Sequence, residues 1–189
     1  MVKKSKLPQI RSKIREKYGT KNDDFLVVTG GKINWARPET LNLMEAIISI
    51  NNPKLKLIVF GKVSDDLNNH FDELCQSAQI KFIGWINAEE SHYLMAASEI
   101  VVFPGLHSVM WEQACALGIP CIFRKLSDVN HVDLGGNAIF LSDVSSESLK
   151  TEIQDLFTNT EKYNHMKKIA ENQGYNNFSY LEIAKKSIS

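Results

Sequence analysis

Two cations and two adjacent glycines follow the first strongly apolar run of the sequence. Gly30 and Gly31 precede Lys32, and Arg37 comes five positions after Lys32. Glycine lets the backbone approach a ligand closely, and two converging cations form charge-assisted hydrogen bonds with one anion. This chemistry fits a diphosphate. The alternative is a solvated turn with two ordinary surface cations, and the GxGxxG pattern of a dinucleotide site is absent.

A second group of polar residues follows the apolar run at 100–103. Pro104 and Gly105 interrupt that run, and Ser108 is placed to cap the helix that follows. Backbone N–H groups in the turn His107-Ser108-Val109 would form an anion site at the positive end of this helix. Glu112 lies one turn further on, where its carboxylate would accept hydrogen bonds from the two hydroxyls of a ribose.

Glu112 has an alternative interpretation as a solvent-facing residue of a capped helix. Its neighbours Met110, Trp111 and Ala114 make the helix apolar almost all round, however. This predicts burial, and a buried carboxylate needs a polar partner. His107 either donates to a phosphate or a sugar hydroxyl, or bonds the backbone of its own loop. It is the first candidate for a catalytic base, and no other catalytic residue is identified.

A glycine and a tryptophan, Gly84 and Trp85, follow the apolar run at 80–83. A nucleobase would lie against the exposed backbone here, and the alternative is that Trp85 packs into the core.

Metal ligands are not evident from sequence spacing. There is no Asp-x-Asp sequence, and no histidine has ligand spacing with a carboxylate. We therefore expect no metal site and metal-independent ligand binding. The remaining histidines are expected at the surface: His70, His92, His131 and His165. Position alone also places Asp128, His131 and Asp133, which follow the fifth apolar run, along the same cleft.

Short apolar runs alternate with helical stretches from residue 23 onward. The runs lie at 25–28, 55–60, 80–83, 100–103, 119–123 and 138–141, and most lack polar alternation. This pattern predicts an α/β fold: a doubly wound, Rossmann-like parallel sheet of about six strands with helices on both faces. Ligands bind outside the carboxyl ends of the strands in such sheets.

The helical stretches have recognisable boundaries. Pro38 opens a helix with Leu41, Met44 and Ile48 on one face, and another helix runs from Asp65 or Asp66 to Ala78. The tail beyond residue 160 predicts two helices separated near Gly174.

Composition limits the classes of partner. Lys plus Arg equals Asp plus Glu at 22 each, so the net charge is zero and nucleic acid is not an expected partner. The three cysteines, Cys75, Cys115 and Cys121, are widely spaced in apolar surroundings and indicate reduced core residues. No apolar run is long enough to span a bilayer, and the basic N-terminus is not a secretory signal. We expect a cytoplasmic protein without a transmembrane segment.

Taken in order, these residues resemble the C-terminal, nucleotide-sugar-binding domain of GT-B glycosyltransferases, especially the group 1 family. The resemblance covers roughly residues 8–173. Gly31-Lys32 with Arg37 is similar to a cationic pair that holds the donor diphosphate in that family. The segment 80–85 is similar to a strand that ends in Phe-x-Gly and meets the base. The segment 100–104 matches the strand leading to the donor site, and 112–120 is similar to Glu-Ala-x-x-x-Gly-x-Pro, whose Glu binds ribose.

Two departures from the family pattern matter. The family often has a second glutamate near the donor sugar, but no acidic residue lies between Pro104 and Glu112. The turn 105–108 looks more like the donor loop of the lipid II-forming N-acetylglucosaminyltransferase, so retention or inversion stays open. GT-B enzymes also have two Rossmann-like domains, whereas residues 1–189 form one, with a connecting helix in 1–22 and C-terminal helices in 160–189.

The resemblance implies one half of a GT-B fold that binds a UDP- or GDP-linked sugar without a cofactor. The expected activity is sugar transfer to a glycan or lipid-linked acceptor in polysaccharide biosynthesis. The acceptor would be held by a missing N-terminal domain or a separate chain, and the whole enzyme would lie peripherally at the inner membrane face. The alternatives are a sugar-nucleotide epimerase-like domain and a non-catalytic nucleotide-binding α/β module.

Overall fold

Six parallel strands form one sheet in the order β3-β2-β1-β4-β5-β6. The structure is a computed structural model that describes residues 7–34 and 38–178. The strands are β1 (Phe25–Ile33), β2 (Leu55–Val63), β3 (Ile80–Phe82), β4 (Ile100–Phe103), β5 (Cys121–Arg124) and β6 (Ala138–Leu141). The predicted doubly wound α/β sheet is therefore confirmed.

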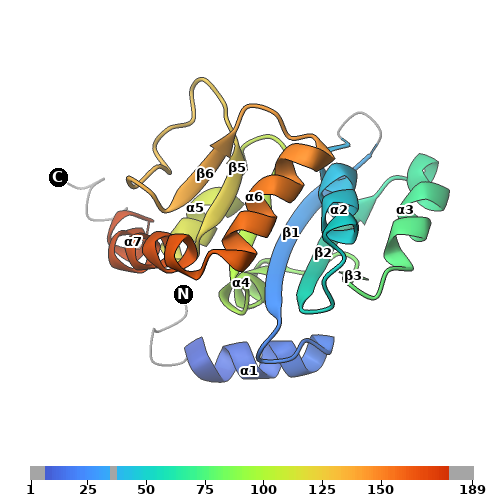
Figure 1. Cartoon of the computed structure of the whole chain (residues 1–189), viewed down its shortest axis with the longest axis horizontal. Coiled ribbons are helices and arrows are strands. Elements are labelled where there is room, and N and C mark those ends of the chain that lie inside the picture. Colours follow the sequence, from blue (N-terminus) through green and yellow to red (C-terminus); the bar gives the residue numbers. More distant parts are fainter. Residues whose placement is uncertain (1–6, 35–37, 179–189) are drawn as a thin grey trace.

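Helices cover both faces of this sheet (Figure 1). They are α1 (Leu7–Tyr18), α2 (Glu39–Ile50), α3 (Asn68–Cys75), α4 (Ala88–Ala96), α5 (Met110–Ala116), α6 (Ser146–Thr158) and α7 (Thr160–Phe178), with a short 3-10 turn η2 (Asp65–Leu67) before α3. Among the described residues, no helix combines the length and the apolar character that crossing a bilayer requires.

Two apolar clusters fill the space between the sheet and its helices. One contains Met44 of α2, Phe71 of α3 and Ile153 of α6, and the other contains Met95 of α4 and Trp111 of α5. In the view of Figure 1, α2 and α6 lie in front of the sheet and α4 and α5 lie behind it. Because both faces are covered, the strands are apolar without alternation, as the sequence indicates.

The first strand is longer than its apolar run. β1 continues through both glycines to Ile33 and stays paired with β2, so Lys32 lies on a strand and not in a loop. Gly31 and Gly61 face each other with φ of 142° and 133°. A Cβ on Gly61 would lie only 1.9 Å from the backbone oxygen of Gly31. Glycine is therefore required where the two strands approach so closely.

Three predicted helix boundaries are wrong. Ser108 does not cap α5, because the N-cap position is Val109 in a helical conformation without a side-chain cap bond. The helix expected to reach Ala78 ends at Cys75, and Ala78 is exposed. Gly174 does not separate two helices, because α7 continues through it. A Cβ there would lie 1.8 Å from the carbonyl oxygen of Cys115, so this glycine allows close packing of α7 on α5.

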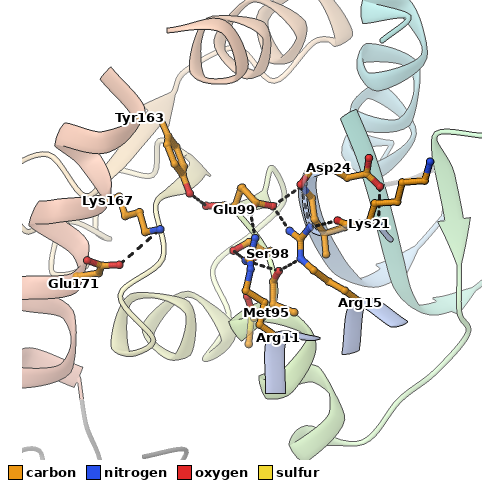
Figure 2. A network of polar contacts seen from close by, with 12 residues as sticks. Arg11, Arg15, Lys21, Asp24, Met95, Ser98, Glu99, Tyr163, Lys167 and Glu171 are labelled. Atoms are coloured by element: carbon orange, nitrogen blue, oxygen red, sulfur yellow. Dashed lines mark hydrogen bonds and ion pairs between the residues drawn. The ribbon is translucent and has the colours of Figure 1, made fainter. Parts of the chain in front are cut away.

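Helix α1 is attached across the amino ends of the strands by a polar network around the buried Arg15 (Figure 2). Glu99 pairs with both Arg11 and Arg15, and it also accepts a 2.6 Å hydrogen bond from the backbone N–H of Leu26. Arg15 is buried and donates to the carbonyl oxygens of Ala97 and Asp24 at 3.1 and 3.0 Å. The amino edge is therefore closed by α1, and the carboxyl edge remains open.

Candidate functional site

The crevice at the carboxyl ends of β1 and β4 is the candidate site. These strands are neighbours, but the chain leaves β1 toward α2 on one face and leaves β4 toward α5 on the other. Such a switch of direction opens a crevice in doubly wound sheets. A pocket of about 170 Å³ lies there, lined by residues 29–32, Glu39, Thr40, residues 103–108, Met110 and Trp111.

A larger pocket, of about 350 Å³, lies at the opposite edge between α1 and α7. Its lining includes Arg11 and Glu99, which already form an ion pair with each other. Lys167 and Glu171 of the lining likewise pair with each other on α7. Since these charged groups already have partners, this pocket is not the candidate.

The lining of the crevice includes four of the residues singled out by sequence: Gly31, Lys32, His107 and Ser108. Lys32 is exposed and makes no ion pair within residues 7–34 and 38–178. Glu39, the acidic residue of the lining, is instead paired with Arg124 at 2.8 Å. The ammonium group of Lys32 is thus available to bind an anion. Arg37, the second predicted cation, lies outside the described residues.

Glu112 accepts hydrogen bonds from two histidines at one oxygen. His107 Nε2 lies 2.8 Å from Glu112 Oε1, and His131 Nε2 lies 2.6 Å from the same atom. Burial by itself raises the pKa of Glu112, but the hydrogen bonds from His131 and His107 outweigh it, so the pKa lies below its ordinary value. The other oxygen, Oε2, is buried and has no hydrogen-bond partner among the described residues.

Aromatic packing fixes the helix that carries Glu112. Trp111 is fully buried and stacks on Phe123, with ring centroids 4.3 Å apart and planes at 6°. The ring of His107 meets Trp111 edge-on at 5.3 Å. The glutamate therefore projects from a helix whose rotation is set by a buried indole, and the ring of His107 lies beside that indole.

The other predicted site residues lie at the same edge but outside the pocket lining. Gly84 has φ of 71°, and its carbonyl accepts a 2.9 Å hydrogen bond from Gly61 N–H. Trp85 is 76% exposed, which excludes the alternative that it packs into the core. Val109 is 61% exposed and Leu106 is 51% exposed, so this edge presents apolar surface to solvent.

The sequence indicates that Glu112 needs a polar partner but identifies neither histidine as that partner: His107 bonds this carboxylate and not the backbone of its own loop. His131 was expected at the surface and, by position, along the cleft; it lies in the segment between β5 and β6 and is 48% exposed while bonding Glu112. Its distance of 19 positions from Glu112 gives no local spacing signal. The position of His131 after the fifth apolar run places it along the cleft, but nothing in the sequence indicates its bond to Glu112.

The chain is similar in sequence to known proteins. The family described as glycosyl transferases group 1 matches residues 10–173. The chain is 18% identical over 185 residues to an uncharacterized glycosyltransferase, MJ1607, of Methanocaldococcus jannaschii, covering 93% of this chain and 46% of that protein. The chain therefore spans about half the length of that relative.

Solved structures share the fold. The structure of Anabaena Alr3699/HepE in complex with UDP and glucose matches with a TM-score of 0.71 and 22% identity, over 96% of this chain and 52% of that one. The C-terminal domain of the group 1 family protein LpcC from Francisella tularensis matches with a TM-score of 0.69 and 22% identity, over 88% of this chain and 89% of that domain. The second match covers nearly all of a C-terminal domain.

Proposed function

Because the chain belongs to the glycosyl transferases group 1 family, matching it over residues 10–173, we propose that it is the donor-binding half of a glycosyltransferase. The donor is a UDP- or GDP-linked sugar, and the acceptor is a glycan or a lipid-linked sugar in polysaccharide biosynthesis. The observation that carries this proposal is the pocket at the β1–β4 crevice, where Lys32 lines one side and the segment 103–108 lines the other.

The diphosphate lies between Lys32 and the turn at His107 and Ser108, with Arg37 as the second cation. Positive charge beside the diphosphate stabilises the negative charge that develops on this leaving group as the glycosidic bond breaks. No metal ion is needed for that neutralisation. The crystal complex of HepE with UDP and glucose supports a nucleoside diphosphate as the ligand class.

The ribose lies against Glu112. Both histidine bonds use Oε1, and Oε2 has no partner among the described residues. Ribose hydroxyls therefore bind by replacing a histidine at Oε1 or after a side-chain rotation that exposes Oε2. A buried carboxylate oxygen without a partner is costly, so the rotation gains a hydrogen bond that the free protein lacks, whereas replacement of a histidine at Oε1 exchanges one hydrogen bond for another.

The acceptor is held by a second domain that faces the carboxyl edge. The chain spans 52% of HepE and 46% of the Methanocaldococcus relative. The exposed side chains of Trp85, Leu106 and Val109 lie at that edge and would be covered by the second domain.

Titration of the purified chain with UDP, GDP and ADP by calorimetry tests the proposal. We expect UDP or GDP to bind with micromolar-to-millimolar affinity and expect the affinity to persist in EDTA. Absence of binding by all three nucleotides would overturn the function. Binding that disappears in EDTA and returns with Mg²⁺ or Mn²⁺ would overturn the metal-independent mechanism while leaving the ligand class intact.

A further inference from the structure

We propose that His107, Glu112 and His131 form a binding site for Zn²⁺ or a similar divalent transition metal, and that metal bound there excludes the nucleoside from Glu112. The metal site stands on geometry alone. Only the competition rests on the proposed function. A metal ion at this site would thus oppose nucleotide binding, unlike a metal ion that neutralises the diphosphate and so assists sugar transfer.

The three ligand atoms are already gathered. His107 Nε2, His131 Nε2 and a Glu112 oxygen all lie within 4.8 Å of one another. The two nitrogens lie 2.8 and 2.6 Å from Oε1. A zinc ion held at about 2.1 Å from each ligand in tetrahedral geometry needs ligand atoms about 3.4 Å apart. Each nitrogen must therefore move away from the oxygen by a fraction of an ångström, and the two nitrogens, which are at most 4.8 Å apart, must reach the same separation from each other.

Both histidines can make that movement. His107 lies between β4 and α5, and His131 lies between β5 and β6, so neither is fixed within a helix or strand. Their side chains are 34% and 48% exposed. The carboxylate, by contrast, comes from α5, whose position is set by the buried Trp111. Two adjustable imidazoles around one fixed carboxylate can accept an ion without a change in the fold.

The donor set suits zinc. Two neutral imidazoles and one carboxylate are a common three-ligand set for this metal, and they leave a fourth position open to water. Oε2 of Glu112 is buried and unpartnered within the described part of the chain. A cation at the carboxylate compensates the charge on that orphaned oxygen. The exposure of the histidines gives the ion a path from solvent.

Competition follows from the shared carboxylate. A metal ion bound to Oε1 withdraws the negative charge that makes the carboxylate a strong acceptor for ribose hydroxyls. The ion and its bound water would also occupy the space beside Glu112 that the ribose needs. This site was not expected from sequence, because His131 lies 19 positions beyond Glu112.

Direct metal binding is the first test. Tag-free protein with reduced cysteines is titrated with ZnCl₂ by calorimetry and with Co²⁺ by visible absorption. We expect one site, a cobalt spectrum without a thiolate charge-transfer band, and at least tenfold weaker binding in His131→Ala and Glu112→Gln. His165→Ala, which removes an exposed histidine on α7, is the matched control and should bind as the parent does. Absence of binding, or equal binding by His131→Ala, would overturn the metal site.

Competition is tested by measuring UDP affinity at a zinc concentration that fills this site in the parent but leaves it mostly empty in His131→Ala, as the direct titrations define. We expect zinc to weaken UDP binding at least tenfold in the parent and in His165→Ala, and to have no such effect in His131→Ala. This comparison removes the contribution of zinc complexed to free UDP, which is the same for all three proteins. Zinc that binds the chain but leaves UDP affinity unchanged would overturn the competition. If UDP does not bind without zinc, the measurement is made with GDP or ADP, and failure of all three to bind would instead overturn the proposed function.

Discussion

His131 Nε2 lies 2.6 Å from Oε1 of Glu112, although the two residues come from different segments of the doubly wound fold. The segment after β5 therefore returns to the helix that follows β4. His107 reaches the same oxygen from the other side, at 2.8 Å. One carboxylate thus links three consecutive parts of the carboxyl edge, and its protonation state affects all of them.

The histidine bonds should be visible in the titration of Glu112. The pKa of this group is lowered in the folded protein, so its contribution to the free energy of unfolding is complete above its ordinary value of 4.5 and is lost as the pH falls through the folded pKa. Replacing His131 with Ala removes one stabilising hydrogen bond to the carboxylate and should raise the pKa of Glu112. Carboxyl-carbon NMR measures this directly.

Two comparisons complete that experiment. Glu112→Gln has no carboxylate to titrate, so acidification should lower its free energy of unfolding less than that of the parent. His165→Ala should leave the pKa of Glu112 where it is. An unchanged Glu112 titration in His131→Ala would show that the 2.6 Å contact does not persist in solution.

Loss of the predicted cations should weaken nucleotide binding. A charge-assisted hydrogen bond contributes about 1.5–3 kcal/mol, which corresponds to roughly tenfold to a hundredfold in affinity. We expect Lys32→Ala and Arg37→Ala each to weaken UDP or GDP binding by that factor in calorimetric titrations. Lys13→Ala on α1, an exposed lysine at the opposite edge, is the matched control. Unchanged affinity in both site variants would place the diphosphate elsewhere.

The network at the amino edge should be important for stability. Glu99→Ala would leave the buried guanidinium of Arg15 without its carboxylate and remove the acceptor of Leu26 N–H. Burial already lowers the pKa of Arg15, and Glu99 opposes that effect. Breaking a buried ion pair from one side costs about 3–5 kcal/mol. We expect a loss of this size in the free energy of unfolding, measured by denaturant titration.

An exposed ion pair between α1 and α4 provides the comparison. Lys17 and Glu90 lie 2.7 Å apart, and both are largely accessible to solvent. Glu90→Ala should therefore have a much smaller effect than Glu99→Ala. Equal effects of the two substitutions would mean that Arg15 finds other partners or water when Glu99 is removed.

The sequence predicts the sheet well because its strands are buried on both faces and so appear as uninterrupted apolar runs. Lys32 and His107 follow two of these runs, and the carboxyl ends of parallel strands lie at the same edge of a sheet. The structure brings both residues to one pocket there. The extension of β1 was missed because Gly30 and Gly31 are poor strand formers, and only the facing Gly61 shows why glycine is needed there. The contact of His131 depends on the path of a loop, which no local pattern encodes.

Sugar transfer should require more than this chain. Transfer needs an acceptor held within attack distance of the anomeric carbon and a base that takes its proton. The described residues form a single six-stranded sheet, whose open edge carries the exposed Trp85 and Leu106. We expect the isolated chain to bind donor without turnover, and expect activity once an acceptor-binding domain is supplied.

A transfer assay with matched donor and acceptor, run with and without that second domain, makes the comparison. UDP binding measured on the same sample shows that an inactive chain is folded and competent for donor. Steady turnover by the isolated chain would contradict the prediction and would place the base within these residues. His107 would then be the first candidate, because it lines the pocket and its Nε2 is held 2.8 Å from Glu112 Oε1. His107→Ala would have to abolish that turnover while leaving UDP bound.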